Sequence, residues 1–265
     1  MKSDGPYERA LDDARAARFN DDAAQVRKSL ARAEDLAQSM TELADCGREY
    51  TDLDWSNEFW RCYARLDSKA VSVDGLLAWA SLCHKHGSDQ ALACWRKALV
   101  RSETVEDTLS CAALLWVPVQ ERAQCVTLAE QRATRCEDWI ALAKFALTEF
   151  RGASDRASPT QSDAQARSIH QWISLAQDLA QTTSEWLDCY ALWFGVLKDS
   201  VLWMTPTFKR FHWKSPSPLK VCLDCAAARA ATRSEREAVD EAKATYYLKP
   251  PGAGDDNATD RPSAH

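Results

Sequence analysis

The sequence predicts an all-α protein, and three observations support that prediction. The 265 residues include 8 glycines and 9 prolines, whereas a sheet protein of this length needs many tight turns. No run of alternating β-branched and polar residues is long enough to indicate a strand. Apolar residues instead recur three and four positions apart, which places them on one face of a helix.

Short segments that begin with an acid recur along the chain at a nearly fixed spacing. They begin at Glu42, Asp74, Asp107, Asp138 and Glu185, so neighbouring copies lie 31 to 33 residues apart until the last interval of 47. Four of these acids follow an alanine nine residues earlier: Ala33, Ala98, Ala129 and Ala176. The pattern predicts units of two amphipathic helices, neither of which can bury its apolar face without a neighbouring pair. An acid at a helix start also favours the positive end of the helix dipole.

The longer last interval predicts an insertion loop over residues 151–162, which are polar and lack helical periodicity. We expect a helical repeat array over residues 1–200, a C-terminal capping segment and helix over 201–247, and a disordered tail over 248–265. Helices are expected near 7–18, 21–38, 40–50, 55–68, 72–86, 88–102, 105–116, 119–133, 136–149, 163–180, 183–198, 201–213 and 217–246.

Composition and cysteine usage predict a cytoplasmic protein. The first six residues lack the apolar region of a signal peptide, and the longest apolar run, residues 189–197, is about half of a membrane span. Five of the ten cysteines, Cys62, Cys94, Cys111, Cys125 and Cys189, fall inside helical patterns, which indicates reduced thiols that pack as small apolar residues. The net charge of −6 gives no general attraction to nucleic acid.

The repeat resembles the tetratricopeptide repeat, in which units of 34 residues form two helices. The family's first helix carries Trp, Leu, Gly and Tyr at offsets 0, 3, 4 and 7, where this chain has Trp139, Leu142, Ala143 and Ala146. In the best unit, offsets 16, 20 and 23 from Gly75 are filled by Ala91, Trp95 and Ala98. The family's closing proline is absent, and Glu103 is near its place. The resemblance covers roughly residues 20–200, with HEAT-type or other α-solenoids as alternatives.

This resemblance implies a right-handed solenoid of about five to six helical hairpins, closed by a long C-terminal capping helix. It also implies a concave groove lined by the first helices. The groove positions in this chain are Leu76, His84, Leu109, Trp116, Ile140, Lys144, Thr148, Leu187 and Phe194. Because they are mainly apolar, they favour an apolar peptide or an amphipathic helix as the bound partner. The alternative is that these side chains belong to the core.

A second candidate surface interleaves aromatic and basic residues between positions 203 and 214. Its members are Trp203, Phe208, Lys209, Arg210, Phe211, Trp213 and Lys214. Such a stretch is typical of contact with single-stranded nucleic acid or a membrane surface. Its position at the end of the repeat also suits a structural cap.

Motifs for catalysis or metal binding are missing or incomplete. The sequence contains no glycine-rich phosphate loop, HExxH or GxSxG, and the Cys222–Cys225 pair lacks a second pair of ligands. We therefore predict a non-enzymatic scaffold or adaptor that binds a protein or peptide and uses no cofactor or metal. A nucleic-acid or membrane-surface accessory that uses residues 203–214 is the alternative function. The partner's identity and the oligomeric state stay open.

Overall fold

The chain is helical throughout the part that the structure describes. The computed structural model describes residues 5–66, 69, 71–153, 159–199, 202, 205–209 and 217–248. Within these ranges it contains fourteen helices and no β-strand, which confirms the all-α class. None of the helices in these ranges combines the length and the apolar character that a membrane crossing requires.

The chain divides into two compact units, residues 1–129 and 130–265. The division falls inside α8, whereas the sequence places the end of the repeat array at residue 200. The helices of the first unit are α1 (Pro6–Phe19), α2 (Ala23–Leu36), α3 (Met40–Asp52), α4 (Ser56–Ala64), α5 (Val73–Lys85), α6 (Gln90–Arg101), α7 (Val105–Ala112) and the start of α8 (Val119–Arg132). Those of the second unit are α9 (Cys136–Ala153), α10 (Pro159–Leu179), α11 (Thr183–Lys198), α13 (Pro206–Lys209), α14 (Pro218–Arg229) and α15 (Arg233–Leu248).

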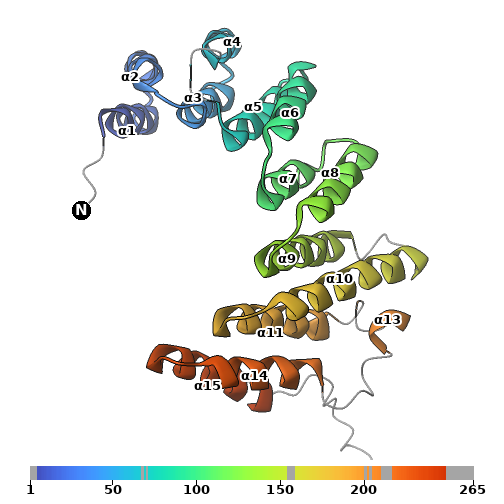
Figure 1. Cartoon of the computed structure of the whole chain (residues 1–265). Helices are drawn as coiled ribbons and strands as arrows, with labels where there is room; N and C mark the ends of the chain where they lie inside the picture. The colour runs from blue at the N-terminus through green and yellow to red at the C-terminus, as the bar shows by residue number, and fades with distance from the viewer. Residues whose placement is uncertain are drawn as a thin grey trace, which may run out of the picture. The chain divides into compact units, whose positions relative to one another are not determined.

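Helices adjacent in sequence pack as pairs in both units. In the first unit, α1 packs on α2, α3 on α4 and α5 on α6, while α3, α5 and α7 also contact one another in succession (Figure 1). In the second unit, α9 packs on α10 and α11, and α11 packs on α14 (Figure 1). Many consecutive helices therefore pack on one another, but α7 and α8 make at most slight contact.

The recurring acids lie in the first turns of the helices that they were expected to open. Glu42, Asp107 and Glu185 each occupy the third helical position and form reciprocal capping boxes with a Ser or Thr at the N-cap. Asp138 accepts the backbone N–H groups of Thr134 and Arg135 at the start of α9, at 3.1 and 2.9 Å. These bonds satisfy N–H groups that have no partner inside the helix.

The start of α5 follows a variant of this pattern. Its N-cap Ser72 accepts the N–H of Gly75 at 3.0 Å, and Asp74 lies one position earlier than the other acids. Gly75 is required because an added Cβ would lie 2.5 Å from the Cβ of Met40 in α3. The close approach of α3 to α5 therefore depends on the absence of a side chain at this position.

The alanines that precede the acids are buried inside the preceding helices. Four of these positions are fully buried: Ala33, Ala98, Ala129 and Ala176. A small residue at such a position lets the second helix of one pair approach its neighbours closely. The spacing of nine residues thus separates a fully buried small residue from the acid near the next helix start.

The predicted single helix over 217–246 is wrong. The chain forms α14 and α15, which are separated at Ala230–Thr232. The break is made by Thr232 and Glu235, because Thr232 N–H donates to Glu235 at 2.8 Å and Glu235 N–H donates back to the Thr232 hydroxyl at 3.2 Å. The buried Ala226 lies nine residues before Glu235, so the alanine-to-acid spacing recurs a further time.

Other helix boundaries also differ from the prediction. The insertion loop was placed at 151–162, but α9 continues to Ala153 and α10 begins at Pro159, which leaves residues 154–158 outside the described part of the chain. Proline suits a first helical position because its missing N–H has no helical partner there. Helix α7 ends at Ala112 rather than at 116, and the Ala112 carbonyl accepts Nε of Arg122 at 2.7 Å. The predicted tail over 248–265 lies outside the described residues apart from Leu248.

Replacement of Gly75 and of Gly195 by alanine should change stability in opposite directions. Gly75→Ala should destabilise the first unit, because overpacking costs about 1–3 kcal/mol and the gain in helix propensity returns only about 1 kcal/mol. Gly195→Ala should stabilise the second unit by about 0.5–1 kcal/mol, since the nearest atom to the new Cβ would be Nη2 of Arg151 at 3.6 Å. Urea unfolding of both variants measures the two effects, and a stabilised Gly75→Ala variant would contradict the crossing geometry.

Candidate functional site

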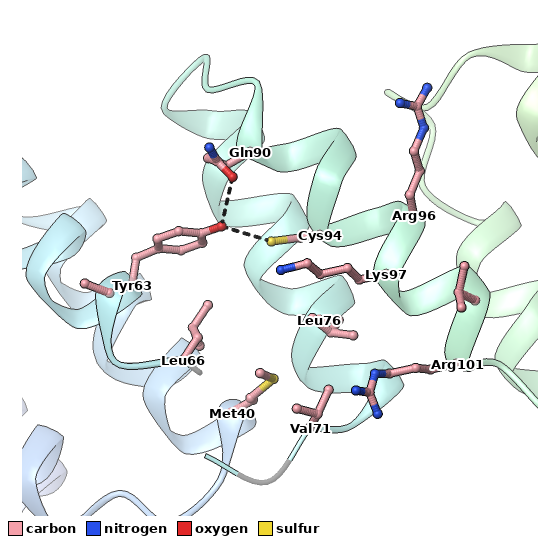
Figure 2. Close-up of a pocket in the computed structure, with 12 residues that line it drawn as sticks. Met40, Tyr63, Leu66, Val71, Leu76, Gln90, Cys94, Arg96, Lys97 and Arg101 are labelled. Carbon is pink, nitrogen blue, oxygen red and sulfur yellow. Dashed lines mark hydrogen bonds between the residues drawn. The ribbon is translucent and has the colours of Figure 1, made fainter. Parts of the chain in front are cut away.

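The clearest candidate site is a pocket of about 610 Å³ in the first unit, between α4 and α6 (Figure 2). We call it the α4–α6 pocket. Its apolar lining comes from Met40, Ala64, Leu66, Val71, Leu76 and Val100. Its other lining residues are Tyr63, Gln90, Cys94, Arg96, Lys97 and Arg101.

The orientation of α6 is fixed by its buried face. Ala91, Cys94, Trp95 and Ala98 are buried, and the indole Nε1 of Trp95 donates to the carbonyl of Cys111 in α7 at 2.9 Å. These anchors turn the opposite face of α6 outward. Lys97, Val100 and Arg101 are exposed as a result.

A tight helix end sets the direction in which α6 leaves α5. Gly87 has a φ of 64°, and its N–H donates to the His84 carbonyl at 2.9 Å. The N–H of Ser88 donates to the Cys83 carbonyl at 3.0 Å. This pair of bonds is the Schellman arrangement, which favours glycine because the left-handed conformation is strained for other residues.

One end of the pocket is closed by a polar bridge between α4 and α6. The Tyr63 hydroxyl donates to Oε1 of Gln90 at 3.3 Å and lies 3.4 Å from Sγ of Cys94 (Figure 2). The Tyr63 ring also packs edge-on against the fully buried Trp79, with ring centroids 5.6 Å apart. The wall formed by Tyr63 is therefore held from two sides.

The apolar lining changes from a buried floor to an exposed mouth. Met40 and Leu76 are each 3% exposed, whereas Val71 is 39% and Val100 84% exposed. Large apolar side chains exposed at the mouth of an apolar pocket are typical of a surface that another molecule covers. The same pocket thus offers a preformed floor and an open rim.

Three cations from α6 line the pocket, and they differ in their partners. Arg96 forms an ion pair with Glu121 at 3.3 Å, and in Figure 2 its side chain extends away from Lys97 and Arg101. Lys97 and Arg101 form no ion pair within the described part of the chain. Their charges are available to a ligand.

The groove residues that the sequence predicts in the first unit do not form one surface. Leu76 and Leu109 are buried, at 3% and 6% exposure, and Leu76 also forms part of the α4–α6 pocket floor. His84 and Trp116 stack with their rings 4.7 Å and 12° apart. This stack lines a second pocket of about 630 Å³ beside the α5–α6 loop.

The groove residues of the second unit are mostly engaged with their neighbours. Ile140 is buried at 5% exposure, and Thr148 donates its hydroxyl to the Lys144 carbonyl. Lys144 forms an exposed ion pair with Asp188 at 3.1 Å. Phe194 is half-buried beneath the ammonium of Lys198, which lies 4.2 Å from the ring centroid. Leu187 is also half-buried.

Phe208 is the member of the basic aromatic stretch whose burial the structure describes, and it is not exposed. Phe208 is fully buried against the rings of Trp193 and His170, so its assignment as a surface contact residue is wrong. Phe208 is buried because hydrogen bonds hold α13 against α10. Asp163 of α10 accepts hydrogen bonds from both the backbone N–H and the hydroxyl of Thr207. Lys209 ends α13, and the other predicted members lie outside the described residues: Trp203, Arg210, Phe211, Trp213 and Lys214.

The sequence analysis missed the exposed face of α6. The family resemblance directs attention to first helices, whereas the α4–α6 pocket lies mainly on the second helices of two successive pairs. The exposed Val100 between Lys97 and Arg101 is the feature of the sequence that could have indicated it. An apolar residue on the polar side of an amphipathic helix breaks the expected pattern.

The cysteines pack as small apolar residues. All ten are free thiols, and nine of them are buried. Burial raises the pKa of the Cys46 and Cys222 thiols to about 12 each, so the reactive thiolate is rare at neutral pH. Among the described residues, no group of three or more His, Cys, Asp or Glu side chains is arranged to hold a metal ion.

A buried carboxylate in the first unit has a structural role. Glu34 is 2% exposed and accepts hydrogen bonds from Tyr50 at 3.0 Å, Arg61 at 2.8 Å and Arg65 at 3.0 Å. Burial alone would raise the pKa of Glu34, but these donors outweigh it and lower the pKa below its ordinary value. The cluster joins α2, α3 and α4, and with Asp35, which also pairs with Arg65, it contains two carboxylates and two guanidinium groups.

Comparison of the chain with protein-family models, curated proteins and solved structures found no significant match. The resemblance to tetratricopeptide repeats therefore stays a prediction.

Glu34→Gln should destabilise the protein by about 1–3 kcal/mol at neutral pH, because Arg61 and Arg65 lose the carboxylate that neutralises them. Since the pKa of Glu34 is lowered by folding, its stabilising effect is present above the unfolded value of about 4.3 and is lost as the pH falls through the folded value. Urea unfolding of both proteins should therefore show a difference that shrinks below about pH 4.

The matched control is Asp35→Asn, which removes the other carboxylate that contacts Arg65. The Asp35 side chain is 76% exposed, so its removal should cost less than about 1 kcal/mol. Equal losses for the two variants would contradict a special role for the buried carboxylate.

Proposed function

We propose that this chain is a non-enzymatic scaffold that binds a protein partner, and that the α4–α6 pocket receives part of that partner. The observation that carries the proposal is the pocket itself, which combines a buried apolar floor, an exposed apolar mouth and two cations that have no ion pair among the described residues. Its volume of about 610 Å³ is within the usual range for a site that binds several side chains or a small molecule.

The proposal includes a helical-hairpin repeat as the underlying architecture, with a tetratricopeptide-like arrangement as its form. The recurring caps at Glu42, Asp107, Glu185 and Glu235 support it, as do the buried alanines nine residues earlier. Arrays of helical pairs present extended surfaces that other proteins bind. A cytoplasmic location agrees with the predominance of buried, reduced cysteines.

The site proposed here differs from the groove that the sequence predicts. The predicted groove follows first helices, and three of its members are buried: Leu76, Leu109 and Ile140. The α4–α6 pocket follows second helices and includes only Leu76 from that set. The mouth residues Val71 and Val100 are accessible, so a partner can reach them directly.

Removal of the apolar mouth should abolish peptide capture without unfolding the protein. A library of random dodecapeptides would be selected on the immobilised full chain, and the enriched peptides would be titrated by fluorescence anisotropy. Val71→Asn/Val100→Asn should weaken binding at least about tenfold, since each tenfold step corresponds to about 1.4 kcal/mol. Asparagine is neutral, so the change tests apolar contact and not charge.

Phe19→Asn is the control, because Phe19 is 92% exposed at the end of α1 and lies outside the pocket lining. It should leave both peptide affinity and helical content unchanged. Peptides that bind the pocket variant and the wild type equally well would show that the α4–α6 pocket is not the site, and a library that yields no binder would refute peptide binding by this chain.

A further inference from the structure

The charges at the mouth of the α4–α6 pocket are arranged in one stripe along α6. Lys97 and Arg101 are four residues apart, so they project from the same face about 6 Å apart along the helix axis. Val100 lies three residues after Lys97, about 60° around the helix from it on the side away from Arg101, and is 84% exposed. The two cations therefore share one face of α6, and an exposed apolar side chain borders that face.

Among the residues that the structure describes, no acid lines the pocket beside these two cations. The described residues that line the pocket include three cations and no carboxylate. Neither Lys97 nor Arg101 is paired within the described ranges, whereas Arg61, Arg65 and Arg96 of the same unit all have carboxylate partners. The pocket is thus a locally positive site on a chain whose net charge is −6.

The apolar parts of the site limit what can occupy it. Met40, Leu66 and Leu76 form a floor that only an apolar group can cover favourably, because a polar group there would lose its contact with water. Val71 and Val100 extend this apolar surface to the mouth. An inorganic anion would satisfy the cations alone, and a nucleic-acid backbone would bring no aliphatic group to the floor.

We infer that the occupant of the α4–α6 pocket is an acidic segment of a partner protein that inserts a large aliphatic or aromatic side chain and places two carboxylates beside Lys97 and Arg101. This inference rests on the proposed peptide-binding function and specifies its chemistry. Carboxylates four residues apart on a helix match the spacing of the two cations. The apolar side chain supplies most of the affinity, while the charges select the partner and speed its association.

The dodecapeptide selection described above tests the inference through the composition of the enriched peptides. They should contain Asp or Glu within one helical turn of Leu, Ile, Met, Phe or Trp. Lys97→Glu/Arg101→Glu should weaken their binding at least about tenfold, and added salt should weaken binding to the wild type. Oligothymidylate should not displace the peptides.

The chain offers a closely matched control variant. Lys28 and Arg32 are exposed, lie four residues apart on α2 and have no ion pair in the described part of the chain. Lys28→Glu/Arg32→Glu therefore makes the same change in net charge at the same helical spacing but outside the pocket lining. It should bind the enriched peptides with an affinity within about twofold of the wild type.

The outcomes separate the inference from the proposed function. Enriched peptides that require Val71 and Val100 but lack acids would overturn the inference and leave the proposed function standing. Equal weakening by the two charge-reversed variants would also overturn it, because the effect would then come from net charge alone. Displacement by oligothymidylate would identify a nucleic-acid site instead. Binding that is unaffected by changes at Val71 and Val100 would overturn both proposals.

Discussion

The starts of α3, α7, α9 and α11 depend on one interaction, the capping of free N–H groups by an acid at the third helical position. Glu42, Asp107 and Glu185 form reciprocal boxes with their N-cap residues, and Asp138 accepts two backbone N–H groups. Such a cap fixes the residue at which a helix begins and therefore the face that it turns toward its neighbours. The alanine nine residues before each of these acids is fully buried.

The α4–α6 pocket follows from the same geometry. Trp95 and the buried alanines of α6 fix its inner face, so the remaining face with Lys97, Val100 and Arg101 must point outward. Tyr63 then spans from α4 to α6 and closes one end of the space between the two second helices. The site is thus a product of how consecutive pairs pack, since residues from α3, α4, α5 and α6 all contribute to it.

Local patterns were enough to predict the helices, but they were insufficient for the site. Most helix starts could be predicted from apolar residues spaced three and four apart and from capping residues, because both patterns depend only on residues within one or two turns. The break between α14 and α15 was missed because the surrounding segment is rich in alanine and contains neither glycine nor proline, so only Thr232 and Glu235 mark it. The pocket was missed because it joins Tyr63 to Gln90 across a long stretch of chain. Whether a lysine or arginine finds a carboxylate is likewise decided by tertiary packing, as the contrast between Arg96 and Arg101 illustrates.

Because the buried cysteines are spread over many helices, their thiols can report where the packing between helices opens locally. The cysteines buried in the first unit are Cys46, Cys62, Cys83, Cys94, Cys111 and Cys125, and those buried in the second are Cys136, Cys189 and Cys222. A thiol-specific alkylating reagent can reach each sulfur only when its surroundings open. The order in which these positions acquire label, followed by peptide mass mapping, would therefore rank the helix pairs by how readily each one separates, without any substitution in the chain.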